Sequence, residues 1–165
     1  MASCWPSCSA LLLSIITSVR VWRRPLLAIQ PCHFEKNLAH IALGARIERQ
    51  KVGDSPVPAD EHNLLEGARV YKKNCASCHG IPDQPDSPYE RTMFPRPTAL
   101  FRGKGVTDDP PAESYWKAAN GIRLSGMPSF KNQLTETQLW QVSQLVAHAN
   151  DLTASVKAEL AHSSP

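Results

Sequence analysis

Hydrophobic and polar positions repeat with helical spacing in several stretches of the chain, and no stretch shows the alternation of a confident β-strand. The clearest repeat runs from Leu64 to Cys75, at positions i, i+4, i+7 and i+11, and Asp60 precedes it as the expected N-cap. Gly67 interrupts this helix at a cost of about 1 kcal/mol relative to alanine, which indicates the close approach of another helix. The pattern as a whole predicts an all-α fold.

A second helix is predicted to begin after Thr135, because Thr135-Glu136-Thr137-Gln138 forms a capping box. Asn150 is expected to end this helix in a left-handed conformation. Its apolar face consists of Leu139, Val142, Val146 and Ala149.

A third helix is indicated between Ala112 and Ala119. Asp109 and two prolines precede it, where proline suits the first turn of a helix, and Asn120-Gly121 closes it. The segment between His79 and Asp109 is rich in proline and has little periodicity, which predicts a wrapping loop.

The candidate chemistry lies in the segment Cys75-Ala76-Ser77-Cys78-His79. This spacing is typical of covalent haem attachment: each thiol bonds to one vinyl group, and the following histidine binds the iron. With five cysteines and six histidines in 165 residues, roughly 0.005 such matches are expected by chance. A zinc site would need a second C-x-x-C pair, and a thioredoxin-like site a βαβ context. A disulfide is possible only without haem.

A methionine opposite the histidine would complete the coordination of the iron and raise its reduction potential. Met127 is the expected ligand, because Gly126 allows the backbone to approach the porphyrin and Pro128 stiffens the loop. Met93 is the weaker candidate, since it lies only 14 residues after His79. The remaining alternative, ligation by two histidines, would use His62 or His148.

These motifs and the flanking helices resemble a class I, monohaem c-type cytochrome domain over Leu64–Asn150, similar to bacterial domains of terminal oxidase subunits and membrane-tethered carriers. The resemblance implies a small all-α fold around one covalent haem c, with His79 and Met127 as axial ligands. It also implies that Gly67 and Tyr71 cross the C-terminal helix, and that a proline carbonyl, here Pro95, accepts the Nδ1 proton of the haem histidine.

The domain organisation expected from the sequence has four parts. Residues 1–30 form a leader or a degenerate export or anchor segment. Cys4 and Cys8 in this segment and Cys32 just after it have no assigned role. Residues 31–59 form an amphipathic helix and a Pro/Gly linker, residues 60–152 the cytochrome domain, and residues 153–165 a C-terminal tail.

The amphipathic helix has Phe34, Leu38, Ile41 and Ala45 at helical spacing. Through residues 33–51 it is expected to lie on a membrane surface or a partner subunit, or to pack on the cytochrome as an ordinary amphipathic helix. The sequence alone leaves these alternatives open.

Charge adds little, because the net charge is only +3, and nothing indicates nucleic-acid binding. We therefore expect a non-enzymatic electron carrier in a respiratory or related chain, on the periplasmic side of the cytoplasmic membrane. Its partners would be redox proteins or a membrane oxidoreductase complex. Two alternatives are a haem relay subunit of a larger oxidoreductase and a gas-binding sensor with an open sixth iron position.

Overall fold

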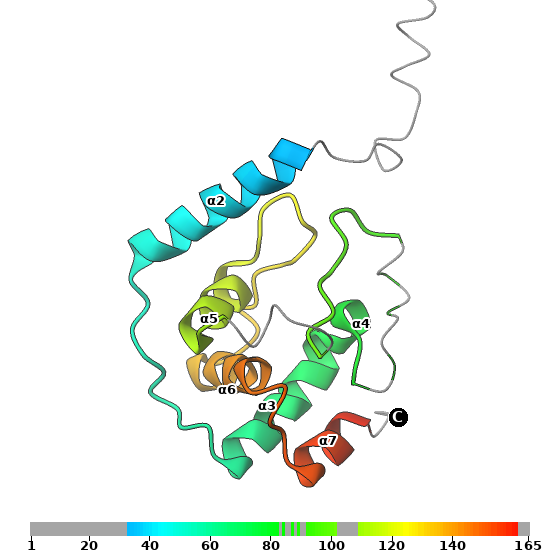
Figure 1. The fold of residues 1–165 in the computed structure, drawn as a ribbon. Coiled ribbons are helices and arrows are strands. Elements are labelled where there is room, and N and C mark those ends of the chain that lie inside the picture. Colours follow the sequence, from blue (N-terminus) through cyan, green and yellow to red (C-terminus); the bar gives the residue numbers. More distant parts are fainter. Residues whose placement is uncertain are drawn as a thin grey trace, which may run out of the picture. The chain divides into compact units, whose positions relative to one another are not determined.

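The computed structural model describes residues 33–161, apart from positions 83, 85–86, 88, 90–91 and 102–108. The predicted leader, residues 1–30, and the cysteines at positions 4, 8 and 32 lie outside the described residues. Within the described part the regular elements are all helices, which confirms the all-α prediction (Figure 1). They are α2 (His33–Gln50), α3 (Glu61–Asn74), α4 (Ala76–His79), α5 (Pro111–Asn120), α6 (Glu136–Ala147) and α7 (Ala154–Ala161).

Helices α3 and α6 cross at Gly67, as the sequence predicts. A methyl group at this position would overlap the carbonyl oxygen of Gln141 and would come within 3.2 Å of Cβ of Leu145. The absence of a side chain therefore lets the two backbones approach each other, which accounts for a residue of low helix propensity in mid-helix.

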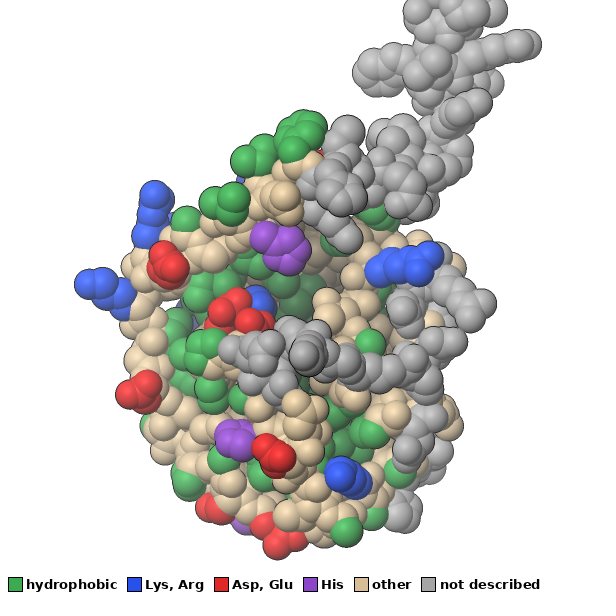
Figure 2. Space-filling model, viewed as in Figure 1, with side chains coloured by type: hydrophobic (Ala, Val, Ile, Leu, Met, Phe, Trp, Pro, Cys, Tyr) green, Lys and Arg blue, Asp and Glu red, His purple; other side chains and the backbone are tan. Residues whose placement is uncertain are grey.

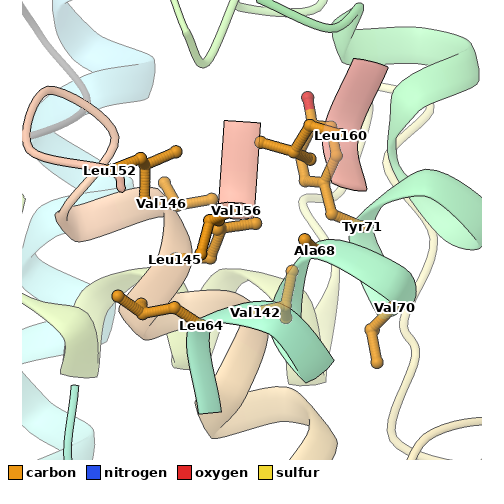
Figure 3. Packing of buried hydrophobic residues seen from close by; sticks show 10 residues of the cluster. All are labelled: Leu64, Ala68, Val70, Tyr71, Val142, Leu145, Val146, Leu152, Val156 and Leu160. Carbon is orange, nitrogen blue, oxygen red and sulfur yellow. The ribbon is translucent and has the colours of Figure 1, made fainter. Parts of the chain in front are cut away.

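The hydrophobic core lies between α3, α6 and α7 (Figure 3). Val156 and Leu160 of α7 are fully buried in it, although the sequence analysis expected residues 153–165 to be a tail. Lys72 of α3 and Glu159 of α7 also form an ion pair of 2.8 Å. The cluster comprises Leu64, Ala68, Val70, Tyr71, Val142, Leu145, Val146, Leu152, Val156 and Leu160.

The predicted start signals of α3 and α6 act as expected. The Asp60 side chain accepts a 2.9 Å hydrogen bond from the backbone N–H of Asn63, and Thr135 and Gln138 form the complete capping box. The expected stop at Asn150 is wrong, because α6 ends at Ala147 and Asn150 does not adopt a positive φ angle.

The last turn of α6 is closed by backbone groups and one side chain. The carbonyl oxygen of Gln144 accepts a 3.1 Å hydrogen bond from the backbone N–H of His148, and Nδ1 of the same histidine lies 2.9 Å from it, so the helix ends without a left-handed residue. His148 is thereby engaged in a helix-capping contact.

Helix α5 begins without a side-chain cap, and Asp109 pairs with Lys117 at 2.9 Å. The bulky residues of α5 serve packing: Tyr115 stacks on Trp140 of α6 with ring centroids 4.1 Å apart, and Trp116 is buried. These contacts fix α5 against α6 and hence fix both ends of the loop between them.

The amphipathic helix predicted near residues 33–51 is observed as α2. Its apolar residues Phe34, Leu38 and Ile41 are exposed, and Figure 2 shows hydrophobic side chains along the surface of this helix. Among the described residues, no helix combines the length and the hydrophobicity that crossing a bilayer requires.

The linker after α2 lacks regular structure but is bonded to α6, because Gln144 donates a 2.9 Å hydrogen bond to the carbonyl oxygen of Val57. Gln50, the last residue of α2, accepts a 3.3 Å hydrogen bond from Nε1 of Trp116.

Candidate functional site

The C-x-x-C-H segment forms a short turn of helix directly after α3. Cys75 ends α3, and its carbonyl oxygen accepts a 2.9 Å hydrogen bond from the backbone N–H of His79. Because residues three apart share a helix face, this turn places Cys75 and Cys78 on the same side. Both side chains are partly buried, and neither thiol is in a disulfide.

Burial raises the pKa of the Cys75 thiol to about 12, and the neighbouring Cys78 adds to this effect. The Cys75 side chain is therefore an uncharged thiol at neutral pH.

His79 is held by one hydrogen bond, in which its Nδ1 lies 2.7 Å from the carbonyl oxygen of Thr98. A carbonyl oxygen can only accept, so Nδ1 carries the proton and Nε2 keeps a free lone pair. Burial lowers the pKa of His79, although the bond to Thr98 opposes this effect, and the ring is neutral at pH 7. A neutral, oriented imidazole with a free nitrogen is the form that binds a metal.

The expected acceptor for this bond, Pro95, was the wrong residue. The loop brings the carbonyl of Thr98, three positions later, to the histidine instead. Any backbone carbonyl can accept this proton, so the path of the loop, and no side-chain signal, decides which one does.

Tyr71 of α3 also stabilises this turn. The sequence analysis expected it only to pack where α3 crosses the C-terminal helix. It is fully buried, and its hydroxyl donates a 2.8 Å hydrogen bond to the carbonyl oxygen of Gly80. Burial raises the pKa of Tyr71, with Cys75 and Cys78 contributing, so the hydroxyl keeps the proton it donates. The detectable signal was a hydroxyl-bearing aromatic on the buried face, one turn before Cys75.

Met127 comes from a separate segment, the loop between α5 and α6 (Figure 1). Its backbone carbonyl accepts a 3.2 Å hydrogen bond from the N–H of Ile122, and its own N–H donates to Oγ of Ser125 at 3.2 Å. The Ser129 hydroxyl donates at 2.6 Å to the carbonyl oxygen of Ala119. The loop is therefore fastened to the end of α5, and Met127 is partly buried within it.

Gly121 makes this closure possible. It adopts a φ angle of +69°, and a Cβ atom there would lie 2.8 Å from backbone atoms of Met127, Pro128 and Ser129. Only glycine fits both the left-handed conformation and the close contact.

The other candidate ligands are placed elsewhere. His62 is exposed on α3, and His148 is engaged at the end of α6. Met93 lies in the wrapping loop, partly buried, next to Gly126. Within the described part of the chain, no group of three or more His, Cys, Asp and Glu side chains is arranged to hold a metal ion.

The donor set fits haem c. It offers two cysteines on one side of a helical turn and an imidazole with a free Nε2 directly after them. The side-chain sulfur of Met127 comes from a loop whose backbone is held by hydrogen bonds. Sulfur and nitrogen donors of this kind suit covalent attachment and iron ligation.

Comparison with known proteins supports this assignment. Residues 62–146 match the family model described as cytochrome c oxidase, cbb3-type, subunit III. No curated protein matches the chain.

Among solved structures, a chain of the reducing HAO-like protein complex of Kuenenia stuttgartiensis is similar in fold, with a TM-score of 0.50 and 24% sequence identity. The similarity covers 57% of this chain and 46% of that chain, so the protein spans less than half of its solved neighbour. The family match covers more than half of the sequence. The chain therefore belongs to the cbb3-type cytochrome c oxidase subunit III family, whose c-type cytochrome domain implies one covalently bound haem c.

Proposed function

We propose that Cys75 and Cys78 would hold the haem through thioether bonds, and that His79 and Met127 would bind its iron. The main support for this proposal is the 2.7 Å hydrogen bond from Nδ1 of His79 to the carbonyl oxygen of Thr98. This bond leaves Nε2 free on the same turn that carries both thiols. The bound haem supplies a one-electron Fe(II)/Fe(III) couple.

The covalent attachment needs no oxidant. Each cysteine adds its S–H across one vinyl double bond: a carbon–sulfur bond forms, and the hydrogen goes to the other vinyl carbon.

Both residues that would bind the iron are held by hydrogen bonds of their own, and this suits rapid electron transfer. The Thr98 carbonyl fixes the His79 ring, and the bonds from Ile122 and Ser125 fix the backbone of Met127. Little rearrangement is needed when one electron arrives or leaves, so the protein acts as a carrier or relay without transforming a substrate.

The family match favours a relay role in a larger complex, since that family is described as an oxidase subunit. We propose that the partners are redox proteins or a membrane oxidoreductase complex in a respiratory or related chain, located on the periplasmic side of the cytoplasmic membrane. The exposed Phe34, Leu38 and Ile41 of α2 support peripheral contact with that membrane.

A pyridine haemochrome spectrum of protein expressed with a haem-attachment system tests the assignment. The parent should carry one haem c, and Cys75→Ala and Cys78→Ala should each shift the band to that of a haem with a single thioether. A parent without a haem c spectrum would overturn the assignment.

Carbon monoxide binding separates the carrier from a gas sensor. The reduced parent should bind carbon monoxide poorly at neutral pH, because Met127 occupies the sixth position, and Met127→Ala should bind it rapidly. Rapid stoichiometric binding by the parent would favour the sensor.

Membrane contact is tested separately by flotation of the full chain with anionic vesicles, with a Phe34→Ser/Ile41→Ser double variant as the non-binding control.

A further inference from the structure

Met93 touches the loop that carries Met127. A Cβ atom built on Gly126 would lie 2.6 Å from Cε of Met93, so the methionine methyl occupies the space beside this glycine. Gly126 adopts a φ angle of +77° and directly precedes Met127. The contact joins two segments that are separated by more than thirty residues of sequence.

The same wrapping loop also holds the proximal histidine. Thr98 binds Nδ1 of His79 at 2.7 Å, and Met93 lies five residues before Thr98 in the same segment. In Figure 1 this segment and the loop between α5 and α6 extend beside each other on the same side of the helices. One segment thus bonds His79 through a backbone carbonyl and touches Gly126, the neighbour of Met127, through the Met93 side chain.

The wrapping loop itself is anchored near Met93. The backbone N–H of Met93 donates a 3.0 Å hydrogen bond to the carbonyl oxygen of Tyr89, and Thr92 donates to the same oxygen through its hydroxyl at 3.1 Å. The base of the Met93 side chain is therefore fixed, while its long unbranched chain adapts to the surface it meets.

We propose that Met93 is a positioning residue, which supports Gly126 and thereby holds the sulfur of Met127 against the iron. This inference rests on the proposed ligation by Met127. Met93 fills the space beside a backbone that has no side chain of its own, so its removal would let the Met127 loop move away from the haem.

Imidazole binding to the ferric holoprotein measures how firmly Met127 is held, because imidazole must displace the methionine. We expect Met93→Ala to raise imidazole affinity about fivefold or more, which is about 1 kcal/mol. It should also weaken the sulfur-to-iron charge-transfer band and lower the reduction potential. Met93→Leu, which keeps about the same side-chain volume, should leave imidazole affinity, the charge-transfer band and the reduction potential close to the parent values.

Val156→Ala is the matched control for general destabilisation, since Val156 is fully buried in α7 and belongs to the core cluster. It should lower the stability of the protein without changing imidazole affinity or the charge-transfer band. If Met93 had only a structural role, Met93→Ala would likewise lower the stability without changing imidazole affinity or the charge-transfer band.

A double-mutant cycle tests the contact itself. Gly126→Ala should displace the Met93 methyl and raise imidazole affinity. In that background Met93→Ala should raise imidazole affinity by less than it does alone, because the contact between the two positions is already lost. Strictly additive effects would count against a direct contact between the two positions.

Two further outcomes would overturn the proposal. Unchanged imidazole affinity and potential in Met93→Ala would show that Met93 supports nothing. A charge-transfer band that survives Met127→Ala but is lost in Met93→Ala would make Met93 the ligand itself. A parent that carries haem c but shows no charge-transfer band contradicts methionine ligation, and hence the proposed function, before any Met93 variant is read.

Discussion

The hydroxyl of Tyr71 donates a 2.8 Å hydrogen bond to the carbonyl oxygen of Gly80, the residue that follows His79. Helix α3 therefore holds the turn from both sides, through its continuous backbone and through this side chain. Phe101 packs edge-on against the tyrosine ring at 4.9 Å. The bond joins the core to the residue next to the candidate iron ligand.

Tyr71→Phe should destabilise the holoprotein by about 1–2 kcal/mol, because a buried carbonyl loses its partner while the ring packing remains. Urea denaturation followed by circular dichroism measures the loss. Tyr115→Phe on α5 is the control and should change stability by less than about 0.5 kcal/mol. Equal effects of the two variants would show that the Tyr71 bond contributes nothing specific.

Gly67→Ala should destabilise the protein by about 1–3 kcal/mol, although alanine is the better helix former. The new methyl would meet backbone atoms of Gln141, which cannot move aside as a side-chain end can. Thermal denaturation checks this expectation. The matched control is Gly44→Ala in α2, where nothing lies within 4 Å of the new Cβ atom, and there the change should be neutral or stabilising.

Lys117 should give the protein a pH-dependent contribution at the alkaline end. Its ammonium lies 2.7 Å from Glu113 and 2.9 Å from Asp109. Burial lowers the pKa of Lys117, but the hydrogen bonds and charges of the two carboxylates outweigh it, so the pKa is raised overall. The contribution is therefore complete below the unfolded-state pKa of about 10.4 and is lost as the pH rises through the folded-state value.

Lys117→Met should accordingly cost about 1 kcal/mol near neutral pH, and the difference from the parent should shrink above about pH 10.4. Urea titrations from about pH 8 to about pH 11 measure this, with Lys131→Met as the exposed control. A difference that stays constant over this range would contradict the charge pairing.

Leu160→Ala should destabilise the protein by about 2–5 kcal/mol, since Leu160 is fully buried in the core that α7 shares with α3. Lys157→Ala on the exposed side of α7 should have little effect. Denaturant midpoints of the two variants decide whether α7 is part of the folding unit. If both are neutral, residues after 152 are a dispensable tail.

The elements that the sequence predicted well are those with local signals. Asp60 and the capping box at Thr135 satisfy backbone groups within one turn, so their meaning does not depend on distant contacts. The C-x-x-C-H segment is similar, because its chemistry is set by the spacing itself. Gly67 was informative because a penalised residue in mid-helix needs a tertiary reason.

What sequence reasoning missed depends on the path of the chain. Thr98 carries no signal as an acceptor, because every residue has a carbonyl, and Met93 gains a role only where two loops meet. Helix α7 was overlooked because it is only eight residues long and its burial comes from α3, a distant part of the sequence. Asn150 failed as a stop because α6 ends at Ala147, where the backbone N–H groups of His148 and Ala149 already bond the last carbonyls.

The hydrogen bond between Gln144 and the carbonyl of Val57 has a consequence for any attempt to extend the protein. Residues 51–60 have no regular structure, yet Gln144 of α6 bonds this segment at Val57, and Trp116 of α5 bonds Gln50 at the end of α2. Spacer residues inserted between Gln50 and Val57 would lengthen a segment that is fixed at both ends. Counting linker residues would therefore overestimate how far the end of α2 can move.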